Sequence, residues 1–197
     1  MGAAFDKAIS LIDEANSLDP EIEKAEDGRE YPKELLYSRR MSLWLKKLEP
    51  EASEVLQLAV RAQHIKRWTL PRSAYPMDRA GYLKWRTVLK DFHASECASI
   101  MAQAGYSEEL QKRAAFLIRK ERLKQDAETQ CLEDAACLVF LEFYFPEFAA
   151  KHEETKIIEI VRKTWNKMSG RAQEAALKLS FPGPLADTLK KALVNPS

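Results

Sequence analysis

Apolar residues recur at spacings of three and four positions along almost the whole chain. The first set, Phe5, Ala8, Ile9, Ile12 and Ala15, would share one face of an amphipathic helix. No run of alternating apolar and polar residues is long enough to build a sheet. Only 6 of the 197 residues are glycine. The pattern therefore predicts an all-α helical bundle that contains no sheet of more than two short strands.

Prolines and capping residues divide the chain into the expected helices. These run from the N-terminus to about residue 18, over 33–48, from Pro50 to about Trp68, over 79–104, from Ser107, from Asp126 to about Leu141, and over 153–168, 171–179 and 185–194. Residues 19–31 and 69–77 are expected to be loops. The length suits one domain, and no repeat or low-complexity tract suggests a division, so we expect a single domain over residues 1–197.

Charge and cysteine content argue against some classes of protein. Lys and Arg total 31 and Asp and Glu total 30, a net charge of +1, which argues against a polybasic nucleic-acid binder. Cys97, Cys131 and Cys137 form no CxxC motif, so we expect reduced thiols. The N-terminus lacks the pattern of a signal peptide, and no apolar run approaches the roughly 20 residues of a membrane span. We expect a cytoplasmic protein with no membrane partner.

One segment, residues 61–90, is unusually basic. It holds eight Lys and Arg residues against the single acid Asp78, so its local charge is +7. Guanidinium groups bind phosphate oxygens bidentately and aromatic faces can stack on a ring, which makes this segment a candidate anion site. The candidates are Arg67, Arg72, Arg79, Arg86, Trp68, Tyr75, Tyr82 and Trp85. The same composition also suits aromatic core residues covered by basic side chains.

A second group combines imidazole and carboxylate side chains from separate expected helices. It comprises His64, His93 and the adjacent pair Glu133 and Asp134. Such residues can act as acid and base, and His64, His93 and Asp134 could hold one divalent metal ion that generates hydroxide near neutral pH. The alternative is that the histidines are hydrogen-bonded in the core and that the acids only compensate a helix dipole. The chain has no glycine-rich phosphate loop, GxSxG elbow or HExxH motif.

Three runs resemble one particular family. They are residues 61–68 (RAQHIKRW), 81–86 (GYLKWR) and 132–140 (LEDAACLVF). They are similar to the bacterial and fungal family known as domain of unknown function 4202, whose members sometimes carry a glutamyl-tRNA synthetase label. The resemblance extends from about Phe5 to Leu193, and it implies no particular activity.

A more distant similarity is to the all-α HD-domain phosphohydrolases, which depend on a metal ion. Their pattern is a His, then a His-Asp dyad, then a later Asp that is often followed by Ala. His64 matches the first His, and Asp134 with Ala135 resembles the last element. The dyad is missing, because Ala94 follows His93. The similarity implies an HD-like helical fold more than it implies the chemistry.

Three hypotheses about function follow. The first is an HD-like enzyme that acts on a phosphorylated small molecule or nucleotide, with a divalent metal ion as its cofactor. The second is a non-catalytic binder that uses the basic aromatic segment for RNA or for an anionic ligand. The third is a helical module that associates with itself, as a homo-oligomer, or with a partner protein.

Overall fold

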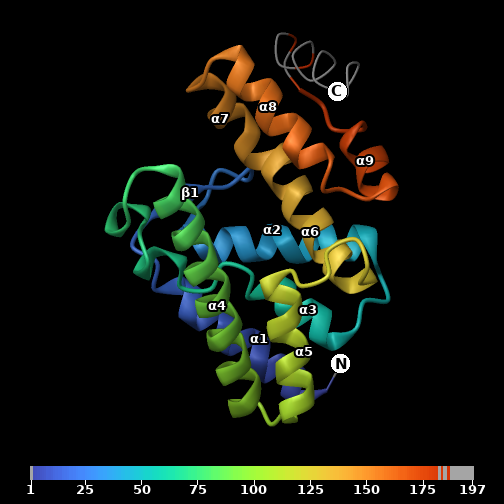
Figure 1. Ribbon diagram of the computed structural model, residues 1–197. Coiled ribbons are helices and arrows are strands. Elements are labelled where there is room, and N and C mark those ends of the chain that lie inside the picture. Colours follow the sequence, from blue (N-terminus) through green and yellow to red (C-terminus); the bar gives the residue numbers. More distant parts are fainter. Residues whose placement is uncertain (1, 182, 184–185, 187–197) are drawn as a thin grey trace.

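Helices make up most of the computed structural model, which describes residues 2–181, 183 and 186 (Figure 1). The α-helices are α1 (Ala3–Ser17), α2 (Lys33–Leu48), α3 (Glu54–Arg61), α4 (Arg79–Gln103), α5 (Glu108–Arg119), α6 (Ala127–Val139), α7 (Phe145–Ala150), α8 (Glu154–Trp165) and α9 (Gly170–Ala176). The prediction of an all-α fold is confirmed. The helix expected over residues 185–194 lies, apart from residue 186, outside the described part of the chain.

A short hairpin occupies the segment that was expected to be a loop over residues 19–31. Strand β1 (Ile22–Lys24) pairs antiparallel with β2 (Glu30–Pro32), and Gly28 adopts the left-handed φ of 81° that their connection requires. The guanidinium of Arg40, in α2, forms ion pairs with Glu23 and Glu26 of this segment. The prediction of a loop is wrong here, although the sheet stays within the expected two short strands.

The helix expected to run to Trp68 ends earlier, at Arg61. Lys66 has a left-handed φ of 51°, which an α-helix cannot contain, and its N–H donates to the side chain of the buried Asn16. Short 3-10 turns then follow at η1 (Arg67–Thr69) and η2 (Arg72–Ala74). Because the chain turns after α3 instead of continuing, residues 63–67 become available to line a pocket.

Pro146 does not end the helix, contrary to the sequence-based expectation. Helical backbone continues from α6 through η3 (Phe140–Tyr144), one turn of π-helix, into α7, whose first turn contains Pro146. Turns of π-helix are frequent at functional sites. The side chains of Phe140 and Tyr144 both line the pocket described below.

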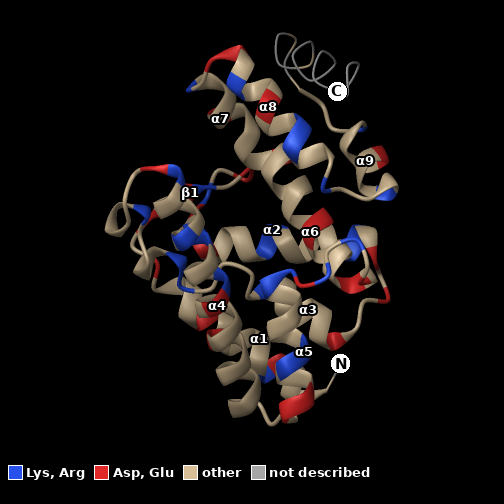
Figure 2. Ribbon diagram, viewed as in Figure 1, with Lys and Arg blue, Asp and Glu red and all other residues tan. Residues whose placement is uncertain are grey.

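The helices pack around one continuous apolar core. Helix α4 lies along α5, while α2 crosses α6 and contacts α3 (Figure 1). The innermost side chains include Met41, Leu58, Leu132 and Leu138, all fully buried. Residues of both charges are spread over most of the elements (Figure 2), as the net charge of +1 suggests.

Two further observations concern the cysteines and the possibility of a membrane span. Cys97, Cys131 and Cys137 are all buried and free of disulfides, as the sequence predicts. Among the described helices, none combines the length and the apolar character that a membrane crossing needs.

Candidate functional site

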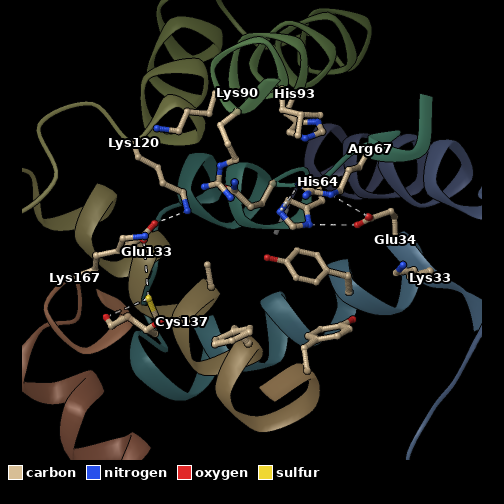
Figure 3. A pocket seen from close by; sticks show the side chains of 18 residues that line it. Lys33, Glu34, His64, Arg67, Lys90, His93, Lys120, Glu133, Cys137 and Lys167 are labelled. Atoms are coloured by element: carbon tan, nitrogen blue, oxygen red, sulfur yellow. Dashed lines mark hydrogen bonds and ion pairs between the residues drawn. The ribbon is translucent and has the colours of Figure 1, made fainter. Parts of the chain in front are cut away.

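A pocket of about 420 Å³ opens between α2, the turn after α3, α4, α6 and α8 (Figure 3). This volume falls in the range of small-molecule sites. Six basic residues line it, against the two acids Glu34 and Glu133. The basic residues are Lys33, Arg67, Arg86, Lys90, Lys120 and Lys167. The pocket therefore carries a clear excess of positive charge inside a chain that is almost neutral.

Figure 3 shows that the charged side chains form two groups. Lys90, Lys120 and Lys167 lie near Glu133 on one side, and His64 and Arg67 lie near Glu34 on the other. We call the first group, together with Arg86, the basic wall. The aromatic side chains of Tyr37, Phe140 and Tyr144 also line the pocket.

Glu133 is the acidic residue of the basic wall, and it is almost fully buried. It forms an ion pair with Lys120, and its other oxygen lies 3.5 Å from Nζ of Lys167. Burial acts to raise the pKa of Glu133, but Lys120, Lys167 and Arg86 outweigh burial and hold that pKa below its usual value. Glu133 is therefore ionised, and it compensates part of the surrounding positive charge.

Arg86 and Lys90 are the cations that remain without a partner. Within the described part of the chain, neither side chain makes a hydrogen bond or an ion pair. Burial lowers the pKa of Lys90, and the neighbouring charges of Lys120 and Arg86 lower it further. These like charges repel one another, and an anion bound between them would relieve that repulsion.

Lys120 reaches the basic wall from a strained backbone. It ends α5 with a left-handed φ of 60°, a conformation that glycine usually supplies at this position. Its side chain is only 12% exposed and points into the pocket toward Glu133 (Figure 3). Strain of this kind persists where the surrounding structure demands it, often at functional sites.

His64 is held between three side chains on the opposite side of the pocket. Its ring stacks on Tyr37 with centroids 4.0 Å apart. Its Nε2 lies 3.4 Å from a nitrogen of Arg67 and its Nδ1 lies 3.4 Å from Oε2 of Glu34. Arginine can only donate, so Nε2 is the acceptor and the single proton of the neutral ring sits on Nδ1, facing Glu34.

The ionisation of this group is set mainly by burial. Burial raises the pKa of Glu34 to about 8, although Arg67 acts to lower it. Burial and the charge of Arg67 hold the pKa of His64 well below its usual value. Near neutral pH, the site therefore combines a neutral imidazole with a carboxyl group that is largely protonated.

His93 lies deeper and is also neutral. Its Nδ1 donates to the carbonyl oxygen of Ile65 at 2.8 Å, because a carbonyl can only accept. Burial lowers the pKa of His93 to about 3. The ring centroids of His64 and His93 are 5.9 Å apart, so the structure brings the two predicted histidines together.

Asp134 does not join them, and the prediction that it shares their pocket is wrong. Its carboxylate accepts hydrogen bonds from the N–H of Ser169 at 2.8 Å and from the hydroxyl of Ser169 at 2.5 Å. It also accepts a hydrogen bond from the side-chain amide of Gln130 at 2.8 Å. On α6, Glu133 faces the pocket, whereas the adjacent Asp134 faces the start of α9.

The residues do not fit the metal ion that the HD similarity implies. Among the described residues, no group of three or more His, Cys, Asp or Glu side chains is placed to hold one. The Nε2 atom of His64 faces the cation Arg67 instead of an open coordination position. Glu133, the acid beside the basic wall, already forms ion pairs with Lys120 and Lys167.

Only two of the eight predicted anion-binding residues, Arg67 and Arg86, line the pocket. Arg72 instead donates to the carbonyl oxygens of Tyr75, Pro76 and Asp78 and so holds its own loop. The predicted residues that do not line the pocket are Arg72, Arg79, Trp68, Tyr75, Tyr82 and Trp85.

Trp85, the buried aromatic residue of the basic segment, helps to hold the structure together. The indole N–H of Trp85 donates to the carbonyl of Leu70 at 2.9 Å, and Arg67 lies over the Trp85 ring at 5.0 Å. Gly81 lets the loop pack closely on α4, because a Cβ there would lie 2.1 Å from the carbonyl oxygen of Pro76. This part of the segment matches the alternative in which basic side chains cover aromatic core residues.

Sequence reasoning missed most of the pocket lining, including Glu34, Tyr37, Lys90, Lys120 and Lys167. A signal existed for Lys90, because Arg86, Lys90 and His93 follow spacings of four and three and so share one face of α4. Glu34 and Tyr37 lie three residues apart on α2, but nothing in the local pattern brings them together with Lys120 and Lys167, which come from distant segments.

A comparison with models of protein families agrees with the resemblance carried by the three sequence runs. The sequence model described as Domain of unknown function (DUF4202) matches residues 6–189. No match was found among curated proteins or among solved structures. The match covers nearly all of the helical fold and the whole pocket. The chain therefore belongs to the DUF4202 family.

Proposed function

We propose that the chain binds a phosphorylated small molecule in this pocket. The observation that carries the proposal is the unpartnered pair Arg86 and Lys90, crowded by Lys120 and Lys167. A phosphate group offers several anionic oxygens, which can accept hydrogen bonds from a guanidinium and from two or three ammonium groups at once. Its binding replaces repulsion between the cations with attraction to the ligand.

The shape of the site favours a small molecule over RNA. The free cations lie inside a pocket of about 420 Å³, whereas recognition of a nucleic-acid backbone uses an extended basic surface. The exposed Arg79 and Tyr82, which RNA could reach, lie outside this pocket.

A second candidate function is acid–base catalysis on the same ligand. It is favoured by the contact between His64 and Glu34, in which the carboxyl group is largely protonated near neutral pH. Such a carboxyl can donate a proton to a leaving oxygen, as buried carboxylic acids do in several enzyme classes. Arg67 lies beside both groups and would stabilise the developing negative charge.

Titration calorimetry with inorganic phosphate at constant ionic strength tests the binding proposal. We expect saturable binding by the wild type and at least tenfold weaker binding by Arg86→Gln, because one charge-assisted contact is lost. Arg79→Gln is the matched control, since it removes the same charge from the exposed start of α4. Equal loss in the two variants, or salt-sensitive binding of single-stranded RNA without phosphate binding, would contradict the proposal.

A further inference from the structure

Besides the basic wall, the pocket carries uncharged polar groups without partners. In the described part of the chain, the Tyr37 hydroxyl makes no hydrogen bond, although its ring is stacked on His64. The Nε2 atom of His93 and the Oε1 atom of Gln63 are buried and also lack partners. All three residues line the pocket.

These groups are mainly hydrogen-bond acceptors. Nδ1 of His93 is committed to the carbonyl of Ile65, so Nε2 of the neutral ring presents a lone pair only. The amide oxygen of Gln63 likewise accepts, and the hydroxyl of Tyr37 can do so. Buried acceptors without donors are costly, and proteins keep few of them. Their concentration in one pocket indicates that the bound molecule supplies the donors.

The register of α4 places one of these acceptors, His93, beside the phosphate position. Arg86, Lys90 and His93 occupy one face of the helix, with His93 three residues beyond Lys90. Three residues of α-helix correspond to a rise of about 4.5 Å. The ligand group that donates to His93 therefore lies only a few bonds away from the phosphate.

We propose that the natural ligand is a phosphorylated polyol or sugar, whose phosphate contacts Arg86 and Lys90 and whose hydroxyl groups meet Tyr37, Gln63 and His93. This inference rests on the proposed function and adds the chemical class of the ligand. The hydroxyls donate to His93 and Gln63 and exchange a hydrogen bond with Tyr37. The ligand thus contacts both the basic wall and these acceptors.

The other common donor group, an ammonium, fits these acceptors less well. An ionised carboxylate would favour an ammonium, and Glu34 is largely protonated near neutral pH. Arg67 lies 3.9 Å from the carboxyl of Glu34 and would repel a second positive charge. A hydroxyl is neutral and avoids both penalties.

Matched pairs of ligands test the inference by titration calorimetry at constant ionic strength. Glycerol 3-phosphate is compared with n-propyl phosphate, and glucose 6-phosphate with n-hexyl phosphate. We expect the hydroxyl-bearing member to bind at least about fivefold more tightly in one or both pairs, since each buried hydrogen bond gained is worth a severalfold change in affinity. O-phosphoethanolamine should bind more weakly than glycerol 3-phosphate.

Two variants test whether the pocket causes the preference for hydroxyl-bearing phosphates. Tyr37→Phe keeps the stacked ring and should reduce the preference for the polyol severalfold, while alkyl phosphate binding stays unchanged. Tyr82→Phe, at an exposed tyrosine outside the pocket, is the control and should change neither.

The outcomes separate the two proposals. If inorganic phosphate and the alkyl phosphates bind as tightly as the polyol phosphates, or if the amine binds best, the inference about ligand class is overturned while the proposed phosphate site stands. If no phosphate binds at all, the proposed function itself fails.

Discussion

Asp134 and Ser169 are joined by two hydrogen bonds, one from the backbone N–H of Ser169 and one from its hydroxyl. The hydroxyl of Ser169 in turn accepts from the N–H of Ala172, in the first turn of α9. A carboxylate buried to 1% exposure thus fastens α6 to the start of the last described helix. The residue predicted to be a metal ligand is a structural anchor.

We expect Asp134→Ala to lower the free energy of unfolding by about 2 kcal/mol, because it leaves the donors on Ser169 without their acceptor. Asp134→Asn keeps one acceptor oxygen and should lose less. Thermal or urea unfolding measures both, and phosphate titration of the folded variants should show unchanged affinity. Loss of phosphate affinity in a stable variant would mean that Asp134 acts at the pocket after all.

Arg72→Ala should destabilise the loop between α3 and α4 and leave the pocket intact. The guanidinium donates to three carbonyl oxygens of that loop, and hydrogen bonds to charged groups contribute about 1.5–3 kcal/mol each when well formed. Faster proteolysis within residues 70–79 together with wild-type phosphate affinity is the expected result. Arg86→Gln should weaken phosphate binding and leave proteolysis of the loop unchanged. Equal behaviour of the two variants would contradict the assignment of Arg72 to the loop and Arg86 to the pocket.

Stability should fall as the pH rises from about 4 to about 8 because of Glu34. Its pKa is about 8 in the folded protein and about 4.3 in an unfolded chain, so the native state binds more protons between these values. Glu34→Gln resembles the protonated form and should melt at a higher temperature than the wild type at pH 8.5. The difference should shrink as the pH falls and vanish below about pH 4. A constant difference across this range would show that Glu34 is ionised in the folded state.

Lys90→Met should melt at the same temperature as the wild type or higher, although it loses phosphate affinity. The pKa of Lys90 is lowered in the folded state, so its charge opposes folding most strongly below that pKa, and the penalty fades as the pH rises toward the value of a free lysine. The stabilisation should therefore be larger at pH 7 than at pH 10. A clear drop in melting temperature at pH 7 would indicate an ion pair of Lys90 in the native state.

The sequence predicts the helices well because their signals are local. Asp78, Ser107 and Asp126 each accept a hydrogen bond from the first turn of the helix that follows, as capping residues should. It misses the hairpin over residues 22–32, because three-residue strands carry too few positions for an alternating pattern. It also misses the turn at Lys66, where a bond to the distant Asn16 overrides helical preference.

The site is harder to predict, because orientation within one turn of helix decides which residues take part. Glu133 and Asp134 are adjacent, yet one meets Lys120 and the other meets Ser169. Within the basic segment, Arg86 enters the pocket while Arg79 stays exposed. Which side chains enter the pocket depends on how α4, α6 and α8 pack against one another. The composition gives the number of charges but not where the charged side chains point.

The pocket draws its walls from six separate stretches of the chain, beginning with Lys33 and ending with Lys167. No short fragment of the polypeptide contains all of them, so occupancy is linked to cooperative folding of most of the helical assembly. A ligand that contacts both Arg86 on α4 and Lys167 after α8 would hold these two segments together. It would therefore slow backbone amide exchange in both of them. Ligand concentration in the cell would then set how long each folded molecule survives proteolysis.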